Sequence, residues 1–66
     1  MTRADIIKII ENEDLRYDGL TQFNHCTGLF FTDPKTGSTL LLHEDTFTLQ
    51  VLRDKVKASR KQFGVV

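Results

Sequence analysis

Residues 30–42 read FFTDPKTGSTLLL, a turn motif between two apolar runs. Pro34 suits the first central position of a type I turn, because its ring holds φ at about −65°. Asp33 before it can accept a hydrogen bond from the following backbone, and Gly37 suits a position where φ becomes positive. This stretch therefore predicts a β-hairpin whose loop is formed by residues 34–37.

The pairing register of the hairpin follows from this loop. With residues 34–37 in the loop, Phe30 faces Leu41 and Gly28 faces His43 across the two strands. Side chains alternate between the two faces of a strand, so both faces of the hairpin receive apolar groups. One face carries Leu29, Phe31, Leu40 and Leu42. The other face carries Cys26, Phe30, Thr32, Thr39, Leu41 and His43.

A helix is predicted on the N-terminal side of the hairpin. Thr2 and Asp5 have the spacing of a capping box, and isoleucines recur at helical spacing after them, which predicts a helix over residues 3–13. The helix dipole disfavours the acidic residues near its end: Glu11, Glu13 and Asp14. We expect solvation, or pairing with basic residues of a second helix, to offset this effect.

The second helix is predicted over residues 46–63. Asp45 and Thr46 offer N-caps, and Gly64 suits the position just past the last turn. The apolar stripe of this helix consists of Leu49, Val51, Leu52, Val56 and Phe63, with Ser59 in the same row. Such a stripe predicts that one face of the helix packs on the rest of the chain.

Residues 15–25 have the weakest pattern in the chain. Leu15 and Tyr17 alternate, and Asp18-Gly19 is a turn signal, which favours a short edge strand on either side of that turn. The fold class predicted for the chain is α+β. It is expected to be a single two-layer domain over residues 1–66, in the order helix, hairpin with a third short strand as an option, and helix.

The composition limits how the chain can be stabilised and where it functions. At 66 residues, folding buries only about 60% of the surface that the unfolded chain exposes. Cys26 is the only cysteine, so no disulfide forms within one chain, and a lone thiol fits a reducing, cytoplasmic compartment. A metal, an oligomer or a well-packed core could supply further stability. No signal peptide or membrane span is predicted, since the apolar run of residues 6–10 is short and contains Lys8.

The residues that could carry chemistry are few. The register places Cys26 and His43 diagonally on one face, near the open end of the hairpin and close to Asp45, and His25 adjoins the cysteine. No CxxC or HxxxH spacing supplies a zinc ligand set, and no third group is evident to orient a Cys-His nucleophile pair. The sequence therefore predicts no metal site, no cofactor and no enzymatic activity.

The second face of the hairpin leads to the preferred functional hypothesis. If both helices pack on the other face, Phe30 and Leu41 form an apolar patch rimmed by Thr32, Thr39 and His43. Alternatively, one helix covers each face, or residues 15–23 fold over the patch. The predicted function is a non-enzymatic protein–protein interaction module, such as a regulator, adaptor or inhibitor of the kind that phages and mobile elements often encode. Its partner is another protein or, equally, a second copy of the chain.

The alternative hypothesis is nucleic-acid binding through the second helix. Its basic residues form one stripe, which could follow a line of phosphates: Arg53, Lys57, Arg60 and Lys61. Nine basic and nine acidic residues give a net charge of zero, however, and no aromatic residue lies on the stripe for base stacking. A solvated helix face or an acidic protein partner explains the stripe better than nucleic acid does.

Overall fold

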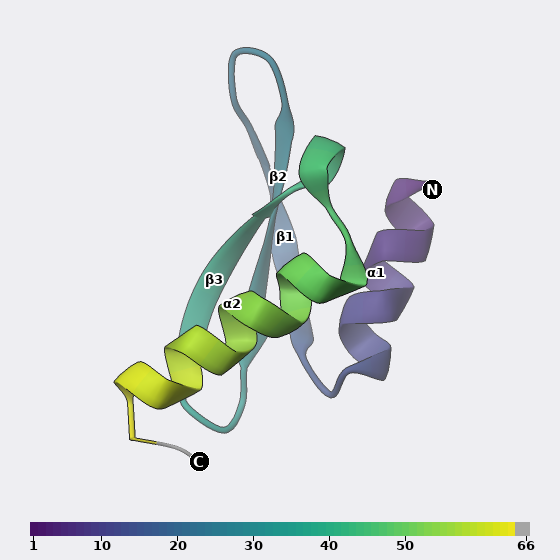
Figure 1. Cartoon of the computed structure of the whole chain (residues 1–66). Coiled ribbons are helices and arrows are strands. Elements are labelled where there is room, and N and C mark those ends of the chain that lie inside the picture. Colours follow the sequence, from purple (N-terminus) through teal and green to yellow (C-terminus); the bar gives the residue numbers. More distant parts are fainter. Residues whose placement is uncertain (65–66) are drawn as a thin grey trace.

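The structure, a computed structural model, confirms the predicted α+β class and describes residues 1–64 (Figure 1). Residues 65–66 of the predicted domain lie outside the described residues. The elements are α1 (Arg3–Asn12), β1 (Arg16–Gln22), β2 (Thr27–Asp33), β3 (Ser38–His43), the short 3₁₀ helix η1 (Glu44–Thr46) and α2 (Leu49–Gln62). Within residues 1–64, no helix is long and apolar enough to cross a bilayer.

The central hairpin has the predicted register. Strands β2 and β3 pair antiparallel with Phe30 opposite Leu41, and the sheet order is β1-β2-β3. In the loop, the Asp33 carboxylate accepts a hydrogen bond from the Lys35 backbone N–H at 3.1 Å, and Gly37 has φ of 74°. The turn residues therefore act as the sequence predicts, which confirms that local turn chemistry sets the pairing of these strands.

The prediction of a turn at Asp18-Gly19 is wrong. Both residues lie inside β1, where the pairing with β2 shifts between Tyr17 and Gly19. Gly19 has φ of 122°, which a residue with a side chain rarely adopts. Gly19 adopts this positive φ in a β-bulge and not in a chain reversal. One continuous edge strand therefore replaces the two short strands that were predicted.

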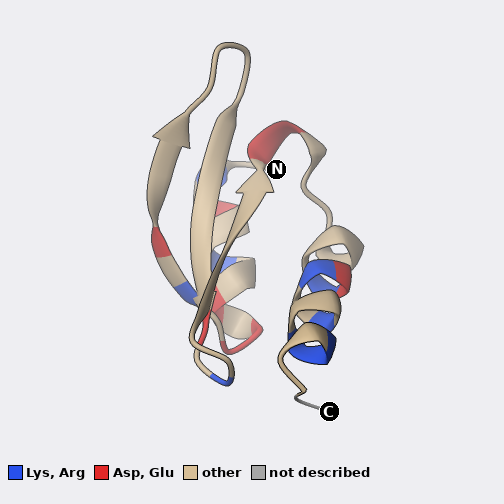
Figure 2. Cartoon of the chain, turned by 90° about the vertical axis from the view of Figure 1, so that its left-hand side faces the viewer, with Lys and Arg blue, Asp and Glu red and all other residues tan. Residues whose placement is uncertain are grey.

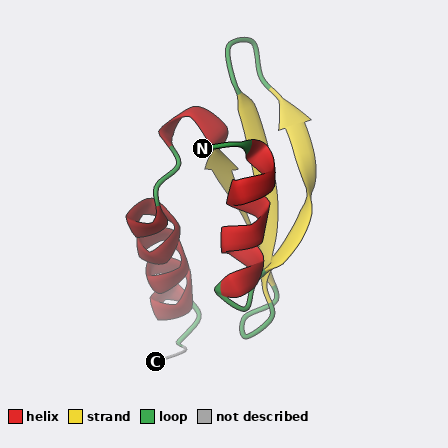
Figure 3. Ribbon diagram, turned by 90° about the vertical axis from the view of Figure 1, so that its right-hand side faces the viewer, coloured by secondary structure: helices red, strands yellow, loops and turns green. Residues whose placement is uncertain are grey.

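Both helices pack on the same face of the sheet, as Figures 2 and 3 show. The core joins apolar side chains of the two helices to the inward face of the hairpin: Ile6, Ile10, Leu15, Leu29, Phe31, Leu42, Leu52 and Val56. Phe31 and Leu42 are 0% exposed. The alternative in which one helix covers each face is therefore wrong, and no helix within residues 1–64 covers the face with Phe30 and Leu41.

Helix α1 begins where the sequence predicts, whereas helix α2 does not. The capping box of α1 is confirmed, since the Thr2 backbone N–H donates to the Asp5 carboxylate and the Asp5 N–H to the Thr2 hydroxyl. Helix α2 begins later than predicted, because Thr48 is its N-cap and accepts a hydrogen bond from the Val51 N–H at 3.0 Å. Asp45 lies in η1 instead of capping α2. This delay leaves Phe47 in an extended conformation, packed against the core.

The apolar stripe of α2 is buried only in its middle. Leu52, Val56 and Ser59 are buried, whereas Leu49 is exposed and Phe63 is 59% exposed. Gly64 has φ of 75° just past the last turn, as predicted. The helix is therefore attached to the sheet through its central turns.

Candidate functional site

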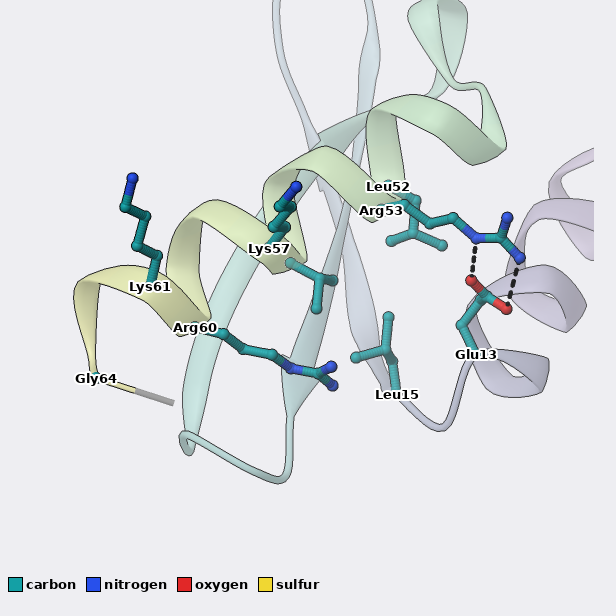
Figure 4. A pocket seen from close by; sticks show the side chains of 9 residues that line it. Glu13, Leu15, Leu52, Arg53, Lys57, Arg60, Lys61 and Gly64 are labelled. Atoms are coloured by element: carbon teal, nitrogen blue, oxygen red, sulfur yellow. Dashed lines mark hydrogen bonds and ion pairs between the residues drawn. The ribbon is translucent and has the colours of Figure 1, made fainter. Parts of the chain in front are cut away.

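A hollow of about 530 Å³ lies between α2 and the corner where α1 leads into β1 (Figure 4). Its floor consists of apolar side chains of the core: Leu15, Leu52 and Val56. Its rim carries charged side chains: Glu13, Arg53, Lys57, Arg60 and Lys61. We call this feature the α2 groove. An open, mostly apolar hollow with a few polar groups at its edge is typical of a binding site.

The spacing of residues along α2 explains how one helix supplies both floor and rim. Leu52 and Val56 are one turn apart and point into the core. Arg53 and Lys57 follow each of them by one position, so they lie beside the floor rather than on it. Four basic residues of α2 are therefore brought to the edge of an apolar surface: Arg53, Lys57, Arg60 and Lys61.

Two of the rim cations are held by carboxylates of the chain itself. The Arg53 Nε lies 2.7 Å from a Glu13 carboxylate oxygen, which joins α2 to the end of α1 (Figure 4). This confirms the expected pairing of an acidic residue of the first helix with the second. The Arg53 guanidinium lowers the pKa of Glu13 by hydrogen bonding, and Glu13 raises the pKa of Arg53.

The second held cation is Arg60. Its guanidinium donates two hydrogen bonds to the Asp33 carboxylate, at 2.8 and 3.2 Å, and Asp33 is 0% exposed. The predicted stripe of four exposed basic residues is therefore wrong at Arg60, which is partly buried in an ion pair. Within residues 1–64, neither Lys57 nor Lys61 has an acidic group at ion-pair distance. These two ammonium groups carry the available positive charge of the groove.

Lowering the pH is expected to destabilise the fold through Asp33. Hydrogen bonds from the Arg60 guanidinium hold the pKa of this carboxyl below its usual value, although burial acts in the opposite direction. A carboxyl whose pKa is depressed in the folded state contributes stability that is complete above its unfolded pKa of about 4 and is lost as the pH falls through the folded value. We therefore expect the free energy of unfolding to decrease as the pH falls below about 5.

The measurement is urea unfolding across this pH range for the wild type, Asp33→Asn and Asp54→Asn. The Asp33→Asn chain should show a shallower dependence on pH, whereas Asp54→Asn, which alters an exposed residue of α2, should match the wild type. Some dependence remains in all three, because hydrogen bonds also lower the pKa of Asp5, Glu13 and Asp18. Equal slopes for Asp33→Asn and the wild type would contradict the assignment.

The outer face of the sheet contains the patch predicted from the hairpin. Phe30 and Leu41 are half-buried there, and Thr39 and His43 are exposed. Thr32 is only 7% exposed, because its hydroxyl donates to the Asp18 carboxylate and lies 3.0 Å from the Thr39 hydroxyl. Thr32 is thus part of a polar network between strands, and little of its side chain reaches the surface.

A residue that the sequence did not single out contributes to this face. Phe23, in the loop after β1, lies over Gly28, where an added Cβ would come within 2.9 Å of the Phe23 ring. The ring centroids of Phe23 and His43 are 5.4 Å apart. Part of the segment 15–23 therefore does cover the outer face, as one alternative proposed: Phe23, itself 41% exposed, and Thr21 lie over Gly28, and Asp18 contacts Thr32.

Three side chains with metal-binding atoms meet at the open end of the hairpin. The Cys26 Sγ lies 3.4 Å from the His43 Nδ1, and a carboxylate oxygen of Asp45 completes a group whose atoms all lie within 4.8 Å of one another. The predicted proximity of these residues is confirmed, whereas His25 is not part of the group. The three residues come from separate segments, which is why a search for short ligand spacings could not identify them.

No protein-family model, no curated protein and no solved structure matches the chain.

Proposed function

We propose that the protein is a non-enzymatic protein-binding module, and that the α2 groove accepts a partner segment with apolar side chains flanked by carboxylates. The observation that carries the proposal is the combination of an apolar floor, at Leu15, Leu52 and Val56, with the ammonium groups of Lys57 and Lys61 at the rim. Apolar side chains of the partner would gain burial on the floor. Its acidic residues would be attracted to the lysines.

The two internal ion pairs support this function. Arg53 and Arg60 are anchored to Glu13 and Asp33, so the walls of the groove are held in place before a partner arrives. A preformed site binds more tightly than a flexible one, because less conformational freedom is lost on binding. A small module that presents such a groove suits a regulator, adaptor or inhibitor of a larger protein.

The hairpin face is the other surface through which the same class of function could operate. Its patch of Phe30, Leu41, Thr39 and His43 is uncovered by helices, but the nearby Thr32 is buried. Asp18, which contacts Thr32 beside the patch, is paired with Arg16, so these two charges offset one another and do not define the charge of a partner. We therefore place the partner in the α2 groove and treat binding at the hairpin face, including dimer formation, as an outcome of the test.

Nucleic-acid binding is the less favoured alternative. Arg53 and Arg60 are engaged by carboxylates of the chain, so Lys57 and Lys61 remain as the main phosphate contacts of the predicted stripe. For duplex DNA, each phosphate contact adds about 0.9 to the steepness with which the logarithm of the binding constant falls as the logarithm of the salt concentration rises. Two such contacts give only weak binding. A groove with an apolar floor is also a poor match for a charged phosphate backbone.

The proposal is tested with a peptide-display library panned against the full chain. We expect the selected peptides to combine apolar residues with Asp or Glu. In the Lys57→Glu/Lys61→Glu chain, binding of the best peptide should weaken by about tenfold or more, since two attractive charges become repulsive. The matched control is Lys8→Glu/Lys35→Glu, which makes the same charge change on α1 and on the hairpin loop and should leave binding nearly unchanged.

Chemical-shift mapping by NMR identifies the surface that the peptide occupies. Changes centred on the amides of Leu52, Val56 and Lys57 would support the groove. Changes centred on Phe30 and Leu41 would overturn it in favour of the hairpin face. Equal weakening by both lysine pairs would show that only the overall charge matters. Tighter binding of a single-stranded oligonucleotide than of any peptide, lost in the Lys57→Glu/Lys61→Glu chain, would instead favour the nucleic-acid alternative.

A further inference from the structure

We propose that Cys26, His43 and Asp45 form a binding site for a zinc ion, with one coordination position open to solvent. The residues come from the position just before β2, from the end of β3 and from η1. Their ligand atoms, one sulfur, one nitrogen and one oxygen, all lie within 4.8 Å of one another. This site lies on a different part of the molecule from the α2 groove and does not depend on the function proposed for it.

The distances suit a tetrahedral ion. Zinc binds a cysteine sulfur at about 2.3 Å and a histidine nitrogen at about 2.0 Å, so the two atoms are about 3.5 Å apart when the angle at the metal is tetrahedral. The observed distance between the Cys26 Sγ and the His43 Nδ1 is 3.4 Å. The sulfur and nitrogen are thus already at the separation that zinc requires, and the Asp45 carboxylate has only a short distance to move.

The types of donor atom indicate which metals can bind. A thiolate and an imidazole are ligands for zinc and for related ions such as cobalt, and a single carboxylate is compatible with them. Magnesium and calcium require several oxygen ligands, and this group offers only one carboxylate. On binding, zinc replaces the thiol proton of Cys26, which passes to solvent.

The surrounding structure holds two of the ligands in place. The Cys26 carbonyl accepts hydrogen bonds from the Phe23 N–H at 2.9 Å and from the Gln22 side chain at 3.4 Å, which fixes the backbone at the cysteine. The imidazole of His43 lies against the Phe23 ring, with 5.4 Å between ring centroids. Ligands attached to the ends of paired strands keep their geometry better than ligands on mobile loops.

The site is accessible from solvent. His43 and Asp45 are exposed and Cys26 is half-buried. Cys26 and Asp45 border a second hollow of about 770 Å³, which is also lined by Asn24, His25 and Glu44. Three protein ligands leave one of the four positions of a tetrahedral zinc ion for water, as in zinc sites that exchange ligands. An ion can therefore enter without opening the fold.

Zinc at this position would add metal–ligand bonds between three segments that backbone pairing, packing and the Cys26–His43 side-chain contact now hold together. It would tie the start of β2, the end of β3 and η1 at the open end of the hairpin, in a chain whose single cysteine excludes an internal disulfide. A structural metal is one of the ways in which chains of this size gain stability. The proposed consequence is that the apo protein is folded and the zinc form is more resistant to unfolding.

The first test is titration of the reduced, full chain with cobalt chloride and zinc chloride. Cobalt should bind at one ion per chain and produce the sulfur-to-cobalt charge-transfer absorption together with the intense visible bands of tetrahedral coordination. Zinc should displace it and abolish these bands. At a zinc concentration about 100 times the dissociation constant, the midpoint of thermal unfolding should rise by roughly 10 °C or more. Cobalt spectra without the sulfur band would overturn the site.

Variants identify the ligands. Cys26→Ser, His43→Gln and Asp45→Asn should each weaken zinc binding, the first two by about 100-fold or more, since loss of a residue that only hydrogen-bonds to a metal ligand can already cost about 10- to 100-fold. The matched controls are His25→Gln, next to the cysteine, and Asp54→Asn, on α2; both should retain wild-type affinity. Far-ultraviolet circular dichroism of the metal-free variants checks that they are folded. Loss of binding in His25→Gln with binding retained in His43→Gln would overturn the assignment.

Discussion

Leu42→Ala is expected to lower the free energy of unfolding by about 3 kcal/mol, because it removes a fully buried side chain from the centre of the core. Leu42 is 0% exposed and packs with side chains of both helices and of β2. Small domains are stable by only about 5–10 kcal/mol, so this loss is a large fraction of the total. Urea unfolding followed by circular dichroism measures it directly.

The matched control is Leu41→Ala, which removes the same atoms one position earlier in β3. Leu41 is half-buried on the outer face of the sheet, which neither α1 nor α2 covers (Figure 2). We expect this change to lower the free energy of unfolding by about 1 kcal/mol, since less apolar area leaves contact with the protein. Equal losses at both positions would contradict the assignment of one core face and one outer face.

Equal losses of stability for Leu41→Ala and Leu42→Ala would indicate that both faces of the sheet are buried. If Leu41 matters as much as Leu42, the outer face is covered in solution, and a second copy of the chain is the simplest cover. Light scattering over a dilution series then decides the matter. A dimer that persists to low concentration would assign Leu41 and Phe30 to a shared core, whereas a monomer would require another explanation for the loss.

Arg60→Gln is expected to destabilise the fold by roughly 3 kcal/mol, because it leaves the Asp33 carboxylate buried without its counter-ion. Asp33 is 0% exposed, and after the change only the Lys35 N–H would remain as a hydrogen-bond donor to the carboxylate among the described residues. The buried charge, rather than the loss of an attraction, is the main source of the effect. Thermal unfolding near neutral pH measures it.

The matched control is Arg53→Gln, seven residues earlier on the same helix. Arg53 pairs with Glu13, but both side chains can be solvated when the pair is broken. Its loss should therefore have a much smaller effect than the loss of Arg60. Equal effects of the two substitutions would contradict the special role of Asp33.

A double-mutant cycle separates the buried charge from other effects of Arg60→Gln. Asp33→Asn removes the charge that Arg60 neutralises, so the double variant should be more stable than the sum of the single losses predicts. If the two losses were simply additive, the interaction between Asp33 and Arg60 would contribute little to the stability of the fold.

The sequence by itself determined the features that depend on residues close together in the chain. Turn chemistry at Asp33, Pro34 and Gly37 set the hairpin register, and the alternation of side chains then assigned Leu29 and Leu42 to one face. The spacing of Thr2 and Asp5 identified the start of α1. In each case the interacting groups are only a few residues apart, so propensity and periodicity describe them well.

Only the tertiary structure decided the features that join distant segments. Asp18-Gly19 could form a turn or a bulge, and pairing with β2 selected the bulge. Similarly, packing of Phe47 on the core moved the start of α2 from Asp45 to Thr48. In both cases the local preference of the chain was outweighed by contacts that form only when the sheet and the helices come together.

The α2 groove and the Asp33–Arg60 ion pair belong to this second group. The α2 groove depends on the approach of Leu15 to a helix more than thirty residues away, and the Asp33–Arg60 pair spans 27 positions. Separations of this kind leave no periodic signal in the sequence, because the geometry that unites the residues is produced by the packing of the whole chain. The cluster of Cys26, His43 and Asp45 differs, because the hairpin register already predicted that these residues lie close together. The structure added that their ligand atoms all lie within 4.8 Å of one another.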